Sequence, residues 1–194
     1  MKKIQDHYFK EARKQGYVAR SAFKLEEMDR KFRLLRRGQH VIDLGCAPGS
    51  WLQYAAKKVL PEGSLTGVDL KQVKIQFLEG VRIFQCDIYM LEEKILASSR
   101  FDLVLSDMAP DTTGIPSVDS QRSYDLNSQA LSFAQRHLKP GGTLVLKAFQ
   151  GEPLNRLKSE IRACFESLKL FKPKSSRSES VEIFVLGFGL LPQS

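Results

Sequence analysis

Cysteine and histidine are scarce in this sequence of 194 residues, and their placement argues against a metal site. The three cysteines, Cys46, Cys86 and Cys164, lie far apart, and no two of them form a CxxC pair. The three histidines are scattered as well. Because zinc sites need clustered ligands and disulfides need an oxidising compartment, we expect no metal and free thiols in a reducing environment.

Long apolar runs are also missing. The longest, Ile183–Leu191, has nine residues, of which two are glycine, whereas a membrane-spanning helix needs about 20 apolar residues. The first residues lack the apolar stretch of a secretory signal, and Asp6 and Glu11 argue against a mitochondrial transit peptide. The sequence therefore predicts a cytoplasmic protein without a membrane partner.

The formal net charge of +8 is concentrated at one end of the chain. Residues 1–37 contain twelve Lys or Arg and five Asp or Glu, a net charge of +7. The remainder contains eighteen Lys or Arg and seventeen Asp or Glu, a net charge of +1. A basic segment beside a nearly neutral domain is typical of proteins that bind nucleic acid, although a solubilising helix face has the same composition. Tyr8, Tyr17 and Phe23 lie among these charges, where they either stack on bases or pack the segment onto the domain, the latter being favoured for Phe23.

The length corresponds to a single domain, with a basic helical arm at 1–37 and a core at 38–194. The core alternates short apolar segments with amphipathic ones, which predicts an α/β domain with a mostly parallel sheet. Strands are expected at His40–Cys46, Ser64–Leu70, Val81–Cys86, Phe101–Ser106, around Lys147, at Leu168–Lys172 and at Val181–Phe188. Helices are expected at Ser50–Val59, Ser120–His137 and Leu154–Glu166.

Two connections between these elements have distinctive sequences. The segment Lys139–Gly142, Lys-Pro-Gly-Gly, is expected to turn before the strand that holds Lys147. The loop at Asp111–Asp119 is long and contains Gly114 and Pro116, so we interpret it as a mobile lid over a substrate.

Lys147 is a charged residue inside an otherwise apolar strand. It lies in the run 142–149, which has the continuous apolar character of an inner parallel strand. An unpaired ammonium there would cost free energy, so the side chain is either partnered or partly neutral. The alternative is a lysine near a strand end whose head group reaches water.

Three successive expected strands close on an acidic residue: Asp69, Asp87 and Asp107. Ligands of open α/β sheets bind beyond the carboxyl ends of the strands, so these residues predict an anionic crevice. A single aspartate in such a place is often a helix cap, but three in succession favour a binding site.

The segment Val41–Trp51 joins the first expected strand to a helix and contains the glycines of a ligand-binding turn. Gly45 and Gly49 permit a tight turn and a close approach of the backbone to a ligand. Pro48 removes one amide donor for a phosphate, and Asp43 adds negative charge where a pyrophosphate would lie. A dinucleotide is therefore disfavoured, and a ligand with an adenosine and a positive centre fits better.

S-adenosylmethionine is such a ligand, because it carries a sulfonium and an ammonium. Asp69, 24 residues after Gly45, is placed to accept hydrogen bonds from a ribose diol. Asp87, at the end of the next strand, would accept from the adenine amine. The glycine turn and the two acids together predict S-adenosylmethionine as the cofactor.

Taken together, these motifs resemble the FtsJ/RrmJ (RlmE) family of S-adenosylmethionine-dependent RNA ribose 2′-O-methyltransferases. The resemblance covers nearly the whole chain and implies a Rossmann-like class I methyltransferase fold, with a seven-stranded, mostly parallel sheet and helices on both faces. Cys46 stands where the family usually has alanine, and Ser50 where a second glycine is common. The motifs are Arg20–Leu25 (RSAFKL), Asp43–Trp51 (DLGCAPGSW), Ser106–Pro110 (SDMAP), Leu146–Glu152 (LKAFQGE) and Lys172–Arg177 (KPKSSR) leading to Glu182.

The resemblance implies a Lys-Asp-Lys-Glu catalytic tetrad. Matched motif by motif, its members are Lys24, Asp107, Lys147 and Glu182. Glu179 competes for the last place, but Glu182 lies within the final expected strand, two residues before an aromatic. Lys147 is the expected proton acceptor. Burial and Lys24 favour its neutral amine, whereas Asp107 and Glu182 favour the ammonium, so the sequence leaves both forms open.

The resemblance also implies which residues contact the cofactor: Gly49, Trp51, Asp69, Asp87 and Asp107. Trp51 would contribute its backbone amide, although its ring could simply pack the helix on the sheet. Taken alone, other site residues have structural alternatives too. Lys24 would be a solvated charge of the basic arm, Glu182 would face solvent from an edge strand, and Asp107 would cap a helix.

The function implied by the resemblance is 2′-O-methylation of a uridine in large-subunit (23S) ribosomal RNA, by a monomer with RNA and not DNA as its partner. Methylation of tRNA or organellar rRNA, and a non-catalytic ribosome-assembly or RNA-binding factor, are the alternatives; an NAD-dependent oxidoreductase is disfavoured by Pro48 and Asp43. Arg36 and Arg37 are candidate RNA contacts. The cluster Lys169, Lys172, Lys174 and Arg177 would extend the RNA surface or form a plain solvated edge.

Overall fold

The computed structural model describes residues 2–73, 75, 80–91, 100–177 and 179–192, with the side chains of 2–6 and 89 excepted. Its strands are β1 (His40–Leu44), β2 (Ser64–Asp69), β3 (Val81–Gln85), β4 (Phe101–Ser106), β5 (Leu138–Phe149), β6 (Phe165–Phe171) and β7 (Glu182–Leu190). Its helices are α1 (Lys2–Lys14), α2 (Ala22–Phe32), α3 (Ser50–Val59), the short 3-10 helix η1 (Ile88–Met90), α4 (Pro116–His137) and α5 (Pro153–Cys164).

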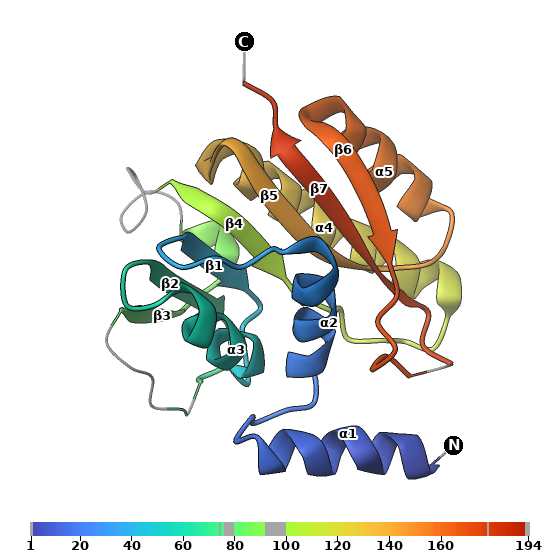
Figure 1. Cartoon of the computed structure of the whole chain (residues 1–194). Coiled ribbons are helices and arrows are strands. Elements are labelled where there is room, and N and C mark those ends of the chain that lie inside the picture. The colour runs from blue at the N-terminus through green and yellow to red at the C-terminus, as the bar shows by residue number, and fades with distance from the viewer. Residues whose placement is uncertain (1, 74, 76–79, 92–99, 178, 193–194) are drawn as a thin grey trace.

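The seven strands form one sheet in the order β3-β2-β1-β4-β5-β7-β6 (Figure 1). β7 runs antiparallel to both of its neighbours, and the other pairs are parallel. The predicted α/β fold with a mostly parallel seven-stranded sheet is confirmed. The parallel strands place their carboxyl ends along one edge of the sheet, here called the carboxyl edge, and their first residues along the opposite, amino edge.

Helices cover both faces of the sheet, as predicted. α2 and α3 lie in front of it and α4 and α5 behind it (Figure 1). One apolar core joins the α2 and α3 side chains to the sheet, and a second joins those of α4 and α5. Because β1, β2, β4 and β5 are covered on both faces, they are nearly continuously buried, whereas the edge strands β3 and β6 are partly exposed.

The basic arm consists of two helices with different surroundings. α2 is part of the domain core, since Leu25 and Met28 have no exposed surface. Phe23 is buried as expected, and Tyr17 is buried beside it, with ring centroids 6.0 Å apart. Tyr17 therefore packs the arm onto the domain and is not presented to a base. α1 lies below α2 at the bottom of Figure 1, on the side of the carboxyl edge.

Two predicted connections differ in the structure. The helix α4 begins at Pro116, four residues before the predicted start, because proline is well suited to the first helical turn. Asp119 in that turn accepts hydrogen bonds from the amides of Thr113 and Gly114 and from the Thr113 hydroxyl. These bonds hold the pKa of Asp119 below its ordinary value. Hydrogen bonds thus join the end of this loop to the helix that follows it, and its role as a mobile lid stays a prediction.

The predicted turn at Lys139–Gly142 is an irregularity within β5 rather than a break before it. Phe101 pairs with Leu138 and Leu103 with Thr143, so extra residues bulge from β5 between these two pairs. Gly141 has φ 79°, which glycine adopts without a steric cost. The described part of the chain contains no helix long and apolar enough to cross a membrane.

Candidate active site

Lys147 is buried on β5 and paired with Asp107, which immediately follows β4. Its relative exposure is 8%. Its Nζ lies 2.9 Å from Asp107 Oδ1 and donates a 2.6 Å hydrogen bond to the Asp107 carbonyl oxygen. The alternative of a lysine whose head group extends into water is wrong. The structure instead holds the amine against one neighbour at the carboxyl edge.

The other two predicted tetrad residues form a second pair beside the first. Lys24 Nζ of α2 lies 2.5 Å from Glu182 Oε1 at the start of β7, and both side chains are nearly buried. Burial raises the pKa of Glu182, but Lys24 and, more weakly, Lys147 outweigh this effect and hold it below its ordinary value. Glu182 is therefore a carboxylate, and Glu179, which is exposed, does not take its place. The structure brings all four residues together.

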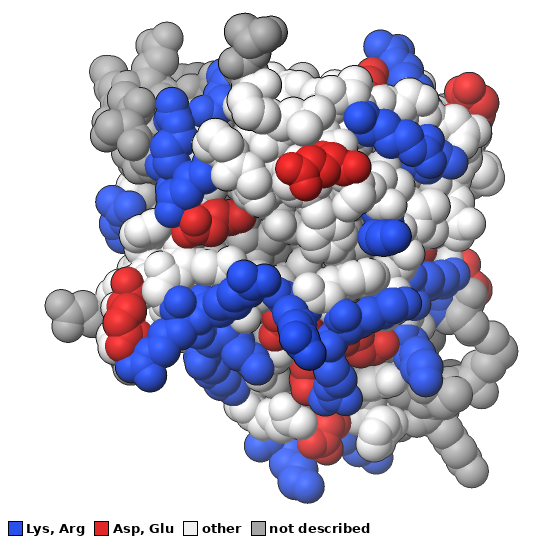
Figure 2. All heavy atoms as spheres, turned by 45° about the horizontal axis from the view of Figure 1, so that its top comes forward, with Lys and Arg blue, Asp and Glu red and all other residues white. Residues whose placement is uncertain are grey.

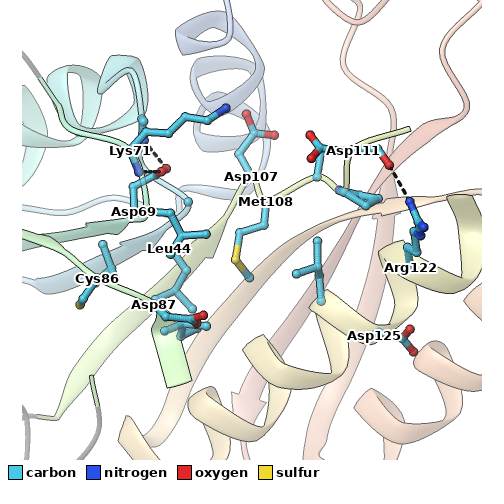
Figure 3. A pocket seen from close by; sticks show the side chains of 18 residues that line it. Leu44, Asp69, Lys71, Cys86, Asp87, Asp107, Met108, Asp111, Arg122 and Asp125 are labelled. Atoms are coloured by element: carbon cyan, nitrogen blue, oxygen red, sulfur yellow. Dashed lines mark hydrogen bonds between the residues drawn. The ribbon is translucent and has the colours of Figure 1, made fainter. Parts of the chain in front are cut away.

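A cavity of about 600 Å³ opens beside this tetrad at the carboxyl edge. Its lining includes Asp69, Asp87 and Asp107, as the strand-end pattern predicts (Figure 3). Leu44 and Met108 add apolar surface between them. The volume of the cavity is typical of pockets for small ligands. Its mixture of acidic and apolar side chains suits a ligand that has an apolar ring and a positive charge. The described residues contain no cluster of three metal-ligating side chains.

Asp69 joins the glycine turn to the end of β2. Its Oδ2 accepts a 2.8 Å hydrogen bond from the Ala47 amide, and its Oδ1 accepts a 2.7 Å bond from the Lys71 amide. Each carboxylate oxygen retains a lone pair for a ligand. Asp87 lies on the same side of the cavity as Asp69 (Figure 3).

The backbone of the glycine turn passes close to the chain that follows β4. Gly45 has φ 77°, and a Cβ added to it would lie 2.5 Å from Met108 Cγ and 3.2 Å from Met108 Cα. A side chain here would displace Met108 from the cavity wall. Gly49 precedes α3 with φ 111°. The glycines are thus required by backbone conformation and by close packing.

Gly49 and Trp51 are not among the residues that line the described cavity. The Trp51 ring is buried, and its Nε1 donates a 2.8 Å hydrogen bond to the Ser21 carbonyl oxygen. The ring centroid is 5.9 Å from that of Phe184. The side chain therefore packs α3 against α2 and β7, and the predicted ligand contact through the backbone amide stays a prediction.

Asp43 plays a different part from the one that its position in the turn suggests. It is 1% exposed, and neither carboxyl oxygen accepts a hydrogen bond from the residues that the structure describes. Burial, together with the neighbouring Asp107 and Asp69, raises its pKa well above the ordinary value. Asp43 does not line the cavity, whereas Asp69 and Asp107 do, so negative charge that faces a ligand there comes from these two residues.

The sequence interpretation missed two polar residues that hold β5 in place. Asn127 on α4 donates hydrogen bonds from Nδ2 to the carbonyl oxygens of Lys147 and Ser123, at 2.9 and 2.8 Å. The Ser123 hydroxyl accepts a 3.1 Å bond from the Phe149 amide. Both side chains are buried. One signal in the sequence could have identified them. Ser123 and Asn127 are four residues apart, so they form a polar pair on the core-facing side of the expected helix.

Arg36 and Arg37, the predicted RNA contacts, lie at the amino edge of the sheet, and their contact with RNA stays a prediction. They precede β1, whereas the tetrad lies at the carboxyl edge, roughly 17 Å away along a five-residue strand. Arg37 also forms an ion pair with Glu62. These charges belong to the amino edge, whose face carries Lys and Arg mixed with Asp and Glu (Figure 2).

Comparison with known proteins shows which family this chain resembles. The model of the family described as FtsJ-like methyltransferase matches residues 17–190. A protein of Desulfatibacillum aliphaticivorans named Ribosomal RNA large subunit methyltransferase E is 46% identical over 186 residues, covering 95% of this chain and 90% of its own. A protein of the same name from Methanothrix thermoacetophila is 45% identical, covering 96% of this chain and 73% of its own.

Solved structures agree as well. The crystal structure of a Plasmodium falciparum protein described as a ribosomal RNA methyltransferase superposes with a TM-score of 0.80 at 28% identity, covering 91% of this chain and all of that one. A Clostridium thermocellum structure, with a TM-score of 0.62 at 15% identity, shares the fold. From the extent of the family match and the identity to its relatives, the chain belongs to the FtsJ-like methyltransferase family.

Proposed function

We propose that this chain transfers a methyl group from S-adenosylmethionine to the 2′-hydroxyl of a uridine ribose in large-subunit ribosomal RNA. The observation that carries the proposal is the buried Lys147–Asp107 pair beside an acid-lined cavity at the carboxyl edge. The relatives named Ribosomal RNA large subunit methyltransferase E support the choice of RNA. The proposal implies a cytoplasmic location, where bacterial ribosomal subunits are assembled.

The cavity residues fit S-adenosylmethionine by their chemistry. Asp69 would accept hydrogen bonds from the ribose diol, and Asp87 from the adenine amine. Asp107 would lie nearest the positive charges, and its Oδ1 is a buried oxygen without a well-aligned hydrogen bond from the described residues. Gly49 and Trp51 would approach the ligand with their backbone. When bound, S-adenosylmethionine supplies a methyl group on a sulfonium, which makes that carbon electrophilic.

The tetrad would prepare the ribose oxygen for transfer. A 2′-hydroxyl is a weak nucleophile, so a positioned base that takes its proton accelerates the reaction by about 100- to 10,000-fold. Lys147 Nζ is the proposed acceptor: a neutral amine takes the hydroxyl proton as the oxygen gains the methyl group, and the resulting ammonium is stabilised by Asp107. Lys24 and Glu182 would hold the ribose and the position of Lys147.

One experiment tests the proposal directly. The protein is incubated with labelled S-adenosylmethionine and, separately, with large ribosomal subunits, free ribosomal RNA and tRNA. The RNA is then hydrolysed in alkali, because a 2′-O-methyl group blocks cleavage of the adjacent linkage. Label in an alkali-resistant dinucleotide from the large subunit or its RNA is expected. Label only in tRNA would overturn the choice of substrate, and transfer to no RNA would favour a non-catalytic assembly factor.

A further inference from the structure

Helix α1 lies on the side of the carboxyl edge, before the segment that the family model matches (Figure 1). The family match begins at Tyr17, three residues after α1 ends. The connection that follows α1 is held against the first turn of α3, where the Gln53 side chain accepts a bond from the Val18 amide and donates one to the Gly16 carbonyl oxygen. Because α3 starts at the carboxyl edge, this contact places the end of α1 there.

The N-terminal part of α1 approaches the loop between β6 and β7 (Figure 1). The ring of Tyr8 lies 5.6 Å from that of Phe23, and burial together with the Glu27 carboxylate raises the pKa of Tyr8. Glu27 itself accepts hydrogen bonds from the amides of Lys174 and Ser175. The helix thus runs under α2 from α3 toward the Lys172–Arg177 motif (Figure 1). Its contacts reach Phe23 and Glu27 of α2, the helix that also carries Lys24.

The face of α1 that points away from the domain is basic and carries an exposed aromatic ring. Tyr8 and Ala12 face the domain. Phe9, Lys10, Arg13 and Lys14 are exposed, Phe9 by 53%. The Arg13 guanidinium lies 6.0 Å from the centroid of the Phe9 ring. An exposed aromatic supported by cations is a poor arrangement for solubility alone, but it suits a nucleic acid, whose phosphates attract the cations and whose bases stack on the ring.

Basic residues at the amino edge are arranged differently. There Arg37 pairs with Glu62, and Lys139 Nζ lies 2.7 Å from Asp102 Oδ1. Figure 2, in which the upper side of Figure 1 comes forward, shows acidic side chains among the Lys and Arg. The charges of that face are thus partly neutralised within the protein, and they lie far from the tetrad.

We propose that α1 is an RNA-docking helix, in which Lys10, Arg13 and Lys14 bind backbone phosphates beside the target nucleotide and Phe9 stacks on an unpaired base there. The inference rests on the proposed function, because it requires an RNA whose target ribose reaches Lys147. In this arrangement α1 supplies affinity for the RNA next to the target nucleotide, and the tetrad carries out the methyl transfer. The exposed Lys174 and Arg177, in the loop joined to α2 through Glu27, continue the same surface.

Matched charge reversals test the phosphate contacts. Lys10→Glu with Lys14→Glu changes two exposed cations of α1, and Arg36→Glu with Arg162→Glu makes the same change in charge at the amino edge. For free large-subunit ribosomal RNA, we expect the α1 pair to raise Kd and KM by about tenfold or more. The slope of log Kd against log salt concentration should fall by about 1.4–1.8, because each lost phosphate contact removes about 0.7–0.9. The kcat of the α1 variant at saturating RNA and its affinity for S-adenosylmethionine should match those of the wild type. The amino-edge control variant should bind RNA with a Kd within about threefold of the wild-type value.

Two substitutions of Phe9 test the stacking. Phe9→Trp retains an aromatic face and should preserve RNA affinity, whereas Phe9→Leu should weaken it by about tenfold. Equal RNA affinity in both variants would overturn the stacking. Thermal melts of each variant check folding, which exposed positions should leave intact.

The outcomes separate this inference from the proposed function. If the wild type methylates RNA and the α1 pair binds RNA equally well, the inference alone is wrong. It is also wrong if the amino-edge control weakens binding as much as the α1 pair does, because the effect would then follow net charge and not position. If the wild type methylates no RNA, both the proposed function and the role of α1 fail.

Discussion

Asp107 holds Lys147 through both its backbone and its side chain. Its carbonyl oxygen accepts a 2.6 Å hydrogen bond from Lys147 Nζ, and its Oδ1 lies 2.9 Å from the same nitrogen. A lysine has a flexible four-carbon stem, so two contacts to one residue at the end of an adjacent strand fix where its amine lies. The same aspartate lines the cavity, which places the amine at the border of the ligand site.

The first prediction concerns the proposed base. Lys147→Ala should lower kcat by at least about 100-fold, because it removes the proton acceptor. The Kd for S-adenosylmethionine, measured by calorimetry, should remain near that of the wild type, since Asp69 and Asp87 are unchanged. Retained turnover would contradict the role of Lys147, and so would a loss that is confined to cofactor binding.

The second prediction concerns the buried pair Lys24–Glu182. Lys24→Met leaves the Glu182 carboxylate without its cation and should lower the free energy of unfolding at pH 7 by about 3 kcal/mol. The exposed pair Arg30–Glu26 is the control, and Arg30→Met should cost less than about 0.5 kcal/mol. Urea denaturation measures both values.

The pH dependence of the same pair has a definite sign. Because the folded-state pKa of Glu182 is lowered, its stabilisation is fully present above its unfolded pKa of about 4.3 and is lost as the pH falls through the lower folded value. The difference between wild type and Lys24→Met should therefore shrink below about pH 4. A difference that is the same at pH 7 and pH 3.5 would show that Glu182 does not depend on Lys24.

The third prediction follows from burial of the Asp43 carboxyl, which raises its pKa. Its pKa is raised in the folded state, so above the unfolded pKa of about 3.9 the unfolded chain gains stability by ionising. Asp43→Asn removes this penalty. The stability of the variant relative to the wild type should rise with pH from about 4 toward neutrality, by at most about 1.4 kcal/mol per pH unit. A constant difference across this range, measured by urea denaturation, would mean that Asp43 ionises in the folded protein.

The fourth prediction concerns Asn127, which supports β5 from α4. Asn127→Leu keeps the number and branching of the side-chain heavy atoms but removes the donor to the buried Lys147 carbonyl oxygen. The free energy of unfolding should fall by about 1–3 kcal/mol. Asn155→Leu, at an exposed position of α5, is the control and should change it by less than about 0.5 kcal/mol. If Asn127 also positions Lys147, kcat should fall while KM for S-adenosylmethionine is unchanged.

Much of the fold could be predicted because its signals are local. The apolar runs of the inner strands, the amphipathic helices and the strand-ending Asp69 and Asp107 all lie where their patterns indicate. The errors lie at the ends of elements. Pro116 starts α4 early, and the residues before Thr143 bulge within β5, because pairing with neighbouring strands extends a strand through residues that favour turns when alone.

The four tetrad residues were identified by motif resemblance, and their pairing was not. Lys24, Asp107, Lys147 and Glu182 come from four segments, and no local pattern states which lysine meets which carboxylate. The burial of Asp43 was unpredictable for a similar reason. A carboxyl in a glycine turn usually faces the ligand, and only the packing of its neighbours shows that this one does not.

The sequence by itself determined the fold class, the acid-lined crevice and the family, because these depend on periodicity and on motifs read along the chain. The tertiary structure decided the pairing of Lys147 with Asp107, the burial of Asp43 and the division of the basic arm between two edges of the sheet. These properties depend on burial and on distances between segments remote in sequence, and only folding of the whole chain sets those distances. Lys10 and Arg36 belong to one basic segment of the sequence, yet they lie toward opposite edges of the folded sheet.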